Sequence, residues 1–335
     1  MSCSFQTNHE GTPFSVSAVM AVYNPKPEFF RQAVLSVLGQ TMPVLELVLV
    51  NDGGSDEFKS VLPDDDRIRV FTKPNEGVAA TRNFAIKQCR GEYIAFLDQD
   101  DYWYSDKLAE QMAMISVKGE ACMVISPVDI VDNQGVPIIK QNRKKVTNRY
   151  FRKIAHPDIR FPLADGNFIY SSTPLIHRRV FECVGLFDSF TQPHDDWDMY
   201  LRIALAGISV HCYRERALSV WRMHDSNESQ KRMAMMLSKC EVEWKILQGG
   251  VPEPVAKIMH SNLALDQIVM DNLWYNEREF ARFRETVRRD LPGLMRCAVN
   301  SGRHDRYVTG YRKRAASAII KSARRYLLSL FSRQR

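Results

Sequence analysis

The first hundred residues alternate apolar runs with helical patterns, and this alternation constrains the fold more than any other feature. Each run has the length and composition of a buried strand. The runs cover residues 16–23, 44–50, 68–71 and 93–97. Between them, residues 27–38 and 78–88 carry apolar side chains at helical spacing. Strands that alternate with helices form a mostly parallel sheet with helical crossovers. We therefore predict an α/β fold.

The rest of the chain divides into two parts. Further strands are predicted at 122–126, 173–177, 208–213 and 217–223, with helices at 106–117, 179–184 and 195–206. After Asn227 helical patterns dominate, at 233–247, 254–274, 277–291 and 315–331. We place a boundary near residue 228, which gives an α/β domain at 1–227 and a helical region at 228–335. The basic, polar stretch 140–153 is predicted to be a mobile loop or an insertion.

Composition describes an ordinary soluble protein with a basic end. The 335 residues carry a net charge of +7. The last 35 positions contain ten Lys or Arg residues and one acid, so the excess of positive charge belongs to the tail. No apolar run reaches the roughly 20 residues of a membrane span, and the N-terminus has no signal-peptide pattern. Seven scattered cysteines without a C-x-x-C pair favour a reducing cytoplasm over a zinc or disulfide framework.

The basic tail mixes its charges with apolar residues such as Ile319, Leu327 and Phe331. A basic amphipathic helix is the pattern of a segment that lies on a membrane surface, and we favour this reading. The alternative is a helix whose apolar stripe packs on the domain or on another subunit. No nucleic-acid motif occurs elsewhere, so nucleic acid is not an expected partner. The predicted location is cytoplasmic, peripheral to the inner face of the plasma membrane.

An acidic cluster, Asp98-Gln99-Asp100-Asp101, directly follows the fourth apolar run. Ligands of α/β proteins bind where strands end at a sheet edge. Carboxylates this close repel one another unless a cation neutralises them, and oxygen ligands suit Mg²⁺ or Mn²⁺. The cluster by itself is equally consistent with a solvated turn that caps the next helix.

Several motifs recur in a fixed order along residues 15–227. Strands end in Tyr23-Asn24-Pro25 and in Asn51-Asp52-Gly53-Gly54-Ser55, and the segment 75–83 and the acidic cluster follow. Further on come residues 184–188, the segment 194–202 and Trp221-Arg222-Met223-His224. This order resembles the family 2 glycosyltransferases, which are inverting enzymes with the GT-A fold, a Rossmann-like mixed sheet flanked by helices.

The resemblance implies a donor side that holds a nucleotide sugar, most often a UDP-sugar. Tyr23 and Asn24 would line the nucleotide pocket, and Asp52 would accept a hydrogen bond from the base. Arg82 would reach the diphosphate, and Asp98 would lie near the ribose or the metal.

The same resemblance assigns the ion, Mn²⁺ or Mg²⁺, to Asp98 and Asp100, with Asp100 coordinating it directly. His224 would add a contact to the metal or to the diphosphate, and the alternative is an ordinary histidine at a strand end. Asp101 would support the site. The alternative for Asp52 is a turn former, for which an Asp before two glycines is well suited.

Three acids, Asp195, Asp196 and Asp198, open the predicted helix at 195–206. Carboxylates favour helix N-termini, so capping explains part of this pattern. An inverting transferase also needs one carboxylate to deprotonate the acceptor hydroxyl. We assign this base to Asp196 and give Asp195 an acceptor contact, although the two roles could be exchanged. A helix N-terminus should lower the pKa of the base and make it weak.

The predicted function is metal-assisted, inverting transfer of a sugar from a nucleotide-diphosphate donor to a saccharide or lipid-linked saccharide. Such transfer belongs to the synthesis of cell-surface polysaccharide or lipopolysaccharide. Two other readings stay open: a non-catalytic relative that binds sugar nucleotides or membranes, and a nucleotidyltransferase. The second would need a Gly-rich basic loop near the first strand, where this chain has Asn24-Pro25-Lys26-Pro27.

Overall fold

A computed structural model describes residues 14–118, 122–138, 150–225, 227 and 232–273. By contacts the chain divides into two compact units, Met1–Val255 and Ala256–Arg335. The first unit contains both sheets and every predicted site residue. The predicted boundary near residue 228 stays a prediction.

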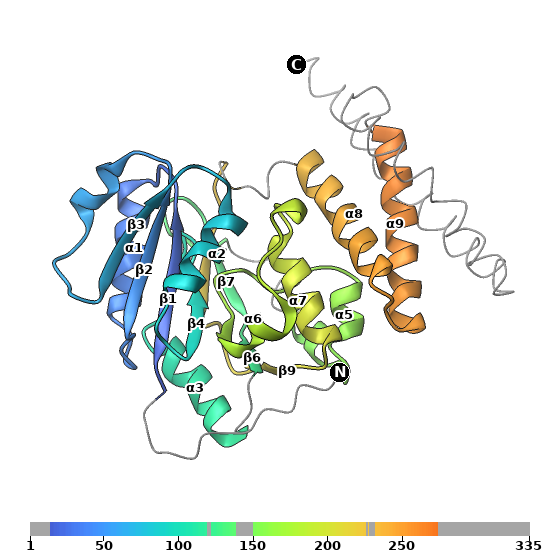
Figure 1. Ribbon diagram of the computed structural model, residues 1–335, viewed down its shortest axis with the longest axis horizontal. Helices are drawn as coiled ribbons and strands as arrows, with labels where there is room; N and C mark the ends of the chain where they lie inside the picture. The colour runs from blue at the N-terminus through green and yellow to red at the C-terminus, as the bar shows by residue number, and fades with distance from the viewer. Residues whose placement is uncertain (1–13, 119–121, 139–149, 226, 228–231, 274–335) are drawn as a thin grey trace, which may run out of the picture. The chain divides into compact units, whose positions relative to one another are not determined.

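The centre of the first unit is a seven-stranded sheet in the order β3-β2-β1-β4-β8-β6-β9 (Figure 1). Its strands are β1 (Val16–Val22), β2 (Glu46–Asp52), β3 (Ile68–Lys73), β4 (Tyr93–Phe96), β6 (Cys122–Ile125), β8 (Leu175–His177) and β9 (Ser209–Cys212). Only β8 runs antiparallel to its neighbours, β4 and β6. The mostly parallel, mixed sheet predicted from the alternation of strands and helices is confirmed.

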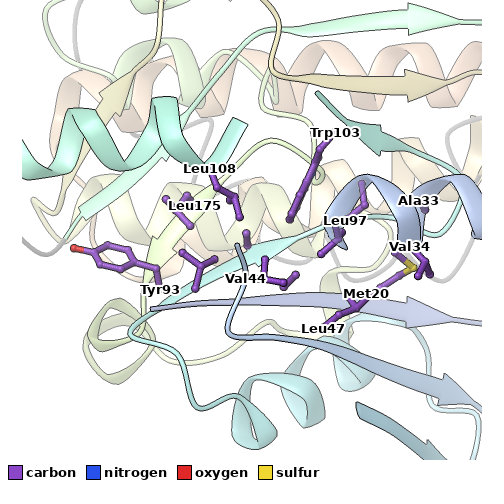
Figure 2. Packing of buried hydrophobic residues seen from close by; sticks show 14 of the residues in the cluster. Met20, Ala33, Val34, Val44, Leu47, Tyr93, Leu97, Trp103, Leu108 and Leu175 are labelled. Carbon is purple, nitrogen blue, oxygen red and sulfur yellow. The ribbon is translucent and has the colours of Figure 1, made fainter. Parts of the chain in front are cut away.

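Side chains alternate between the two faces of the sheet, and each face has its own helices. The even-numbered residues of β1, from Val16 to Val22, pack in one cluster with residues of α1 and α3 (Figure 2). On the opposite face, Phe96 of β4 contacts Phe181 of α6 at a ring-centroid distance of 6.2 Å. These helices are α1 (Pro27–Leu38), α2 (Val78–Gln88), α3 (Lys107–Lys118) and α6 (Arg179–Val184). The fully apolar runs of the sequence are therefore strands buried on both faces.

A second, three-stranded sheet lies beyond the acidic cluster. It has the order β5-β10-β7, with β5 at Tyr102–Trp103, β10 at Ser219–Arg222 and β7 at Val128–Val131. The pairing of Ser219 with Trp103 brings the segment after β10 beside the residues that follow β4. The two-residue β5 was not predicted, because two residues carry no periodicity.

The other named helices are η1 (Asp56–Val61), α5 (Arg160–Ala164), η2 (Ser189–Thr191), α7 (Asp195–Leu205), α8 (Arg232–Gln248) and α9 (Glu253–Leu273). Helix α7 begins with Asp195 and Asp196 and packs against α5 and α8. Residues 150–153, predicted to belong to a mobile loop, are helical, which corrects that part of the prediction.

Several predictions fall outside the described residues. They are the loop at 140–149, the helices at 277–291 and 315–331, and the basic tail with its membrane contact. Within the described chain, none of the helices combines the length and the apolarity that a membrane crossing requires.

Candidate functional site

The candidate site begins where β1, β2 and β4 end side by side. Parallel strands bring their carboxyl ends to one sheet edge, which places Tyr23, Asp52 and Asp98 near one another. Gln99 ties two of these ends together: its Oε1 accepts the Tyr23 N–H at 2.9 Å, and its Nε2 donates to the Tyr23 carbonyl at 3.1 Å. The Tyr23 backbone is thus engaged, while its side chain is 49% exposed.

Asn24 and Gly54 fit together at the next turn. The Asn24 Oδ1 accepts the Ser55 N–H at 2.9 Å, and Asn24 has a φ of 40°. A Cβ atom at Gly54 would lie 2.8 Å from that same Oδ1. The second glycine of Asp52-Gly53-Gly54-Ser55 is therefore required by this close approach.

Asp52 is a buried anchor for the loop before α2. Its Oδ1 accepts from Lys73 Nζ at 2.7 Å and from the Glu76 N–H at 3.0 Å, and its Oδ2 accepts the Gly77 N–H at 2.9 Å. Burial opposes ionisation, but the Lys73 and Glu76 hydrogen bonds outweigh it and lower the pKa of Asp52. A side-chain hydrogen bond with Thr81 also lowers the pKa of Asp52, so four donors surround the carboxylate.

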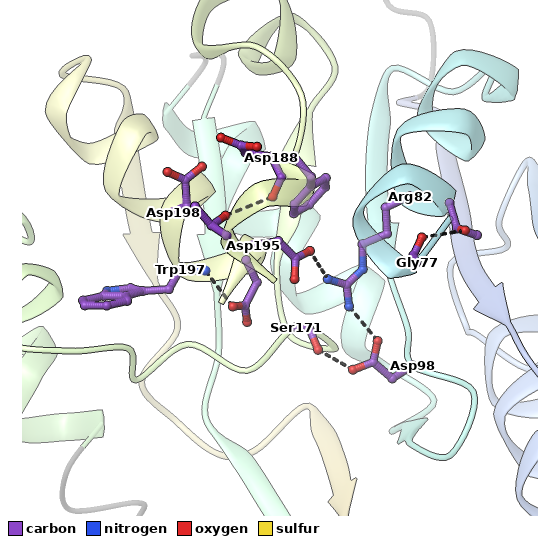
Figure 3. A network of polar contacts seen from close by, with 12 residues as sticks. Gly77, Arg82, Asp98, Ser171, Asp188, Asp195, Trp197 and Asp198 are labelled. Carbon is purple, nitrogen blue, oxygen red and sulfur yellow. Dashed lines mark hydrogen bonds and ion pairs between the residues drawn. The ribbon is translucent and has the colours of Figure 1, made fainter. Parts of the chain in front are cut away.

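Arg82 joins the acidic cluster to the acids of α7. Its Nη2 donates to Asp98 Oδ1 at 2.9 Å, and its Nη1 donates to Asp195 Oδ2 at 3.0 Å (Figure 3). Arg82 is only 6% exposed. Burial lowers the pKa of Arg82, but the charges of Asp98 and Asp195 have the larger combined effect and raise it. The guanidinium contacts two carboxylates here, and its predicted contact with diphosphate stays a prediction.

Asp100 and His224, which were both predicted to contact the metal ion, lie next to each other. Asp100 Oδ2 lies 2.6 Å from His224 Nε2, and Asn227 Nδ2 lies 3.5 Å from the same oxygen. Burial, and then the charge of Asp98, raise the pKa of Asp100. A bound cation would remove this cost of burying the carboxylate.

The Asp100 carboxylate fits Mn²⁺ or Mg²⁺, because both ions prefer oxygen ligands, and the His224 imidazole is the less usual donor of the pair. Asp98 is a less suitable ligand for the ion than Asp100. Its Oδ1 binds Arg82 and its Oδ2 accepts the Ser171 hydroxyl, so both oxygens are already engaged. Within the described chain, Asp98, Asp100 and His224 do not bring three ligand atoms within 4.8 Å of one another.

Asp101 supports the cluster from inside the protein. Its Oδ2 accepts the Ser172 hydroxyl at 2.6 Å, and its Oδ1 accepts the Arg222 N–H at 2.9 Å. Burial, and then Asp100, raise the pKa of Asp101 well above its usual range. Asp101 therefore joins the acidic cluster to Ser172 and to the backbone of β10.

Asp196 opens α7 beside Asp195 and is held by two donors. Its Oδ1 accepts the Trp197 N–H at 2.6 Å, and Asn167 Nδ2 lies 3.3 Å from each carboxylate oxygen. Burial, and then the charge of Asp195, raise the pKa of Asp196 to about 7. The sequence predicted a lowered pKa from the helix N-terminus, and that prediction was wrong, because burial and the neighbouring acid outweigh the dipole.

Two other residues of the first turn of α7, Trp197 and Asp198, make structural contacts. Trp197 is fully buried, and its Nε1 donates to the Leu163 carbonyl at 2.9 Å. Asp198 pairs with Arg202 at 2.8 Å and with Lys245 of α8 at 2.7 Å. The Arg202 guanidinium also donates to carbonyls of the turn before Asp188. These contacts fix the loop that leads into α7.

Four polar residues of the site were missed in the sequence: Gln99, Asn167, Ser171 and Ser172. Gln99 stood inside the acidic motif, where its position between two acids could have singled it out. The other three lie in residues 167–172 and have no motif of their own. Only the fold brings them to Asp98, Asp101 and Asp196.

Comparison with known proteins agrees with this arrangement. A model of the family described as glycosyl transferase family 2 matches residues 17–185, about half of the chain. An uncharacterized glycosyltransferase of Rickettsia typhi is 30% identical over 243 residues, which are 68% of this chain and 70% of that protein. TuaG of Bacillus subtilis, whose name assigns it provisionally to teichuronic acid biosynthesis, is 32% identical over 130 residues, 37% of this chain and 51% of TuaG.

The extent of these matches varies. An uncharacterized glycosyltransferase of Rickettsia felis is 29% identical over 238 residues, which cover 68% of this chain but only 37% of that protein. The structure of residues 1–349 of S. aureus TarS in complex with UDP-GlcNAc superposes with a TM-score of 0.55 at 16% identity. It covers 80% of this chain and 78% of that one. The likeness confirms the predicted GT-A fold.

Proposed function

Because the chain belongs to glycosyl transferase family 2, we propose that it transfers a sugar from a nucleoside-diphosphate donor to a saccharide or lipid-linked saccharide, with inversion and with a divalent metal ion. The observation that carries the proposal is the Arg82 bridge between Asp98 and Asp195. Through these two contacts, Arg82 joins the two acidic motifs into a single site. A site of this kind can hold a leaving group on one side and a base on the other.

The donor half is formed by the strand ends. Asp52, at the end of β2, would accept the N–H of a uracil base, as the family resemblance implies. TarS structures are described with UDP and with UDP-GlcNAc, and this supports a UDP-sugar as the donor. Asp100 and His224 would hold Mn²⁺ or Mg²⁺. When bound, such an ion supplies charge neutralisation for a departing diphosphate.

The acceptor half is formed by the first turn of α7. The acceptor hydroxyl attacks the anomeric carbon while the bond from that carbon to the diphosphate oxygen breaks. The electron pair of that bond leaves with the diphosphate, and Asp196 takes the hydroxyl proton. A pKa of about 7 suits a general base at neutral pH. Asp195 is tied to Arg82 and positions the bridge, which favours Asp196 as the base.

The relatives support only a broad class of acceptor. TuaG is named for a cell-wall polysaccharide pathway, and this supports a role in the synthesis of cell-surface polysaccharide. The predicted cytoplasmic location at the inner membrane face fits a lipid-linked acceptor.

Donor binding is expected to depend on the metal and on Asp100. Purified protein should gain thermal stability from UDP with Mn²⁺ and lose most of that gain with EDTA, because ligands that bind the folded state raise the unfolding temperature. Asp100→Asn removes the charge that holds the ion and should give no Mn²⁺-dependent shift. Asp129→Asn, on β7, is the matched control and should behave as wild type. An equal UDP shift with and without Mn²⁺ would contradict metal-dependent binding.

Transfer is expected to rise with pH through about 7. The base must be ionised, and burial with Asp195 raises the pKa of Asp196 to about 7. The rate should therefore fall about tenfold for each pH unit below that pKa. The measurement is the pH profile of kcat/KM for UDP release. A rate that stays constant from pH 5 to pH 8 would argue against Asp196 as the base.

A further inference from the structure

One short segment, residues 167–172, touches both halves of the site. Asn167 contacts Asp196, the Ser171 hydroxyl donates to Asp98, and the Ser172 hydroxyl donates to Asp101. The Trp103 indole anchors the segment by donating to the Ser172 carbonyl at 2.9 Å. The segment is thus a fixed connection between the acidic cluster and α7.

The Asn167 side chain has a defined orientation. Its Oδ1 accepts the Ile169 N–H at 3.0 Å, so its Nδ2 is the atom that faces Asp196. An amide turned the other way would set two oxygens against each other and leave the Ile169 N–H facing a donor. Its neighbours Phe168 and Ile169 are buried, 6% and 3% exposed, and hold the backbone in place.

Both oxygens of Asp196 are within reach of this amide, at 3.3 Å each. Two contacts from one donor group fix the plane of the carboxylate as well as its position. The Trp197 N–H adds a second donor to Oδ1 at 2.6 Å. Oδ1 therefore carries two hydrogen bonds and Oδ2 one, which leaves Oδ2 the better proton acceptor.

We propose that Asn167 is a positioning residue that holds the Asp196 carboxylate so that Oδ2 receives the proton of the acceptor hydroxyl. The inference rests on the proposed function, because it gives Asp196 the role of base. Asn167 does not touch the reacting atoms and acts through Asp196. It sets the direction of Oδ2 and favours the ionised carboxylate, since a donor to a charged acceptor stabilises the charged form.

Several charges act on Asp196 from the surrounding elements. Asp195 and Tyr200 lie on α7 itself, Arg82 faces it from α2, and Asp98 follows β4. Asp195 and Asp98 favour the protonated carboxyl, whereas Arg82 favours the carboxylate. The Asn167 amide is an uncharged donor that acts in the same direction as Arg82.

The test is the pH profile of UDP release in Asn167→Ala and Asn167→Asp. Asn167→Ala should move the acid limb of kcat/KM to higher pH by about half to one unit, a loss of about three- to tenfold at pH 6.5 that is partly regained at pH 9. The apparent KM for the donor should stay unchanged. Asn167→Asp retains the acceptor for the Ile169 N–H and adds a like charge, so its shift should be larger.

Asn83→Ala is the matched control. Like Asn167, Asn83 accepts a backbone N–H with its Oδ1, that of Phe187, but its Nδ2 donates to the Phe187 carbonyl and not to a carboxylate. The acid limb of the kcat/KM profile of Asn83→Ala should coincide with that of wild type, even if the thermal stability of this variant falls. If Asn167→Ala is unstable, the pH profile of Asn167→Asp still tests the role of Asn167.

The outcomes separate the inference from the function on which it rests. If wild type releases no UDP, or Asp196→Asn is as active as wild type, the proposed function fails. If wild type is active and Asp196→Asn is not, an unshifted acid limb in both Asn167 variants overturns the inference alone. A fall in rate that is equal at every pH would also overturn it, because it would show a structural role only.

Discussion

Replacing Asp196 by asparagine is expected to lower sugar transfer by about 10²- to 10⁴-fold, the range that a positioned general base contributes. The amide has nearly the same shape, so the contacts with Asn167 and Trp197 need little rearrangement. Binding of UDP, measured by thermal shift or calorimetry, should stay near the wild-type value. The expected result is thus a loss of chemistry with retention of the donor.

The control for this variant is Asp188→Asn, in the loop before α7. Asp188 pairs with Lys245 at 2.7 Å and has no contact with Arg82 among the described residues. Its loss should leave transfer within the scatter of the assay. If Asp196→Asn transferred normally while Asp195→Asn did not, the roles assigned to the two acids would have to be exchanged.

Arg82→Ala is expected to cost both stability and transfer. The substitution leaves Asp195, whose side chain is 2% exposed, without its counter-ion. Removing one partner of a buried ion pair costs about 3–5 kcal/mol. The cost should be larger at pH 8 than at pH 5, because Asp195 escapes it by taking up a proton at lower pH. Urea unfolding at the two pH values measures the difference.

Arg160→Ala is the control for this prediction. Arg160 also pairs with an aspartate, Asp158, at 2.6 Å, but 40% of its side chain is exposed. An exposed ion pair contributes about 0–1 kcal/mol. Arg82→Lys should recover part of the stability and little of the transfer, since one ammonium cannot replace a forked contact to two carboxylates. A cost for Arg82→Ala no larger than that for Arg160→Ala would refute the buried bridge.

The elements of the fold could be predicted where the local pattern is strong. The helix expected at residues 179–184 is observed as α6, Arg179–Val184. The strand expected at 16–23 is β1, Val16–Val22. The helix has apolar residues at helical spacing and the strand is a continuous apolar run, and a break residue follows each, so neighbouring residues alone determine them. Strand β5 has two residues, and only its pairing with β10 defines it.

The site could be predicted in its parts but not in its connections. Family motifs pointed to Asp98, Asp100, His224 and Asp196, and the structure brings Asp100 and His224 to 2.6 Å. The contact of Arg82 with Asp195 spans 113 positions, and no local pattern encodes such a distance. The pKa of Asp196 was predicted with the wrong sign, because the sequence shows the helix N-terminus but not the burial or the geometry of Asp195.

The most direct test of the central claim, that one base on α7 drives a single displacement, is the configuration of the released sugar. The claim requires that the anomeric carbon is attacked once, from the side opposite the diphosphate. Proton NMR during turnover of a UDP-sugar with Mn²⁺, with water as the acceptor, reports this configuration before the sugar equilibrates. We expect the configuration opposite to that of the donor, and no product with Asp196→Asn. A product that retains the donor configuration would contradict it.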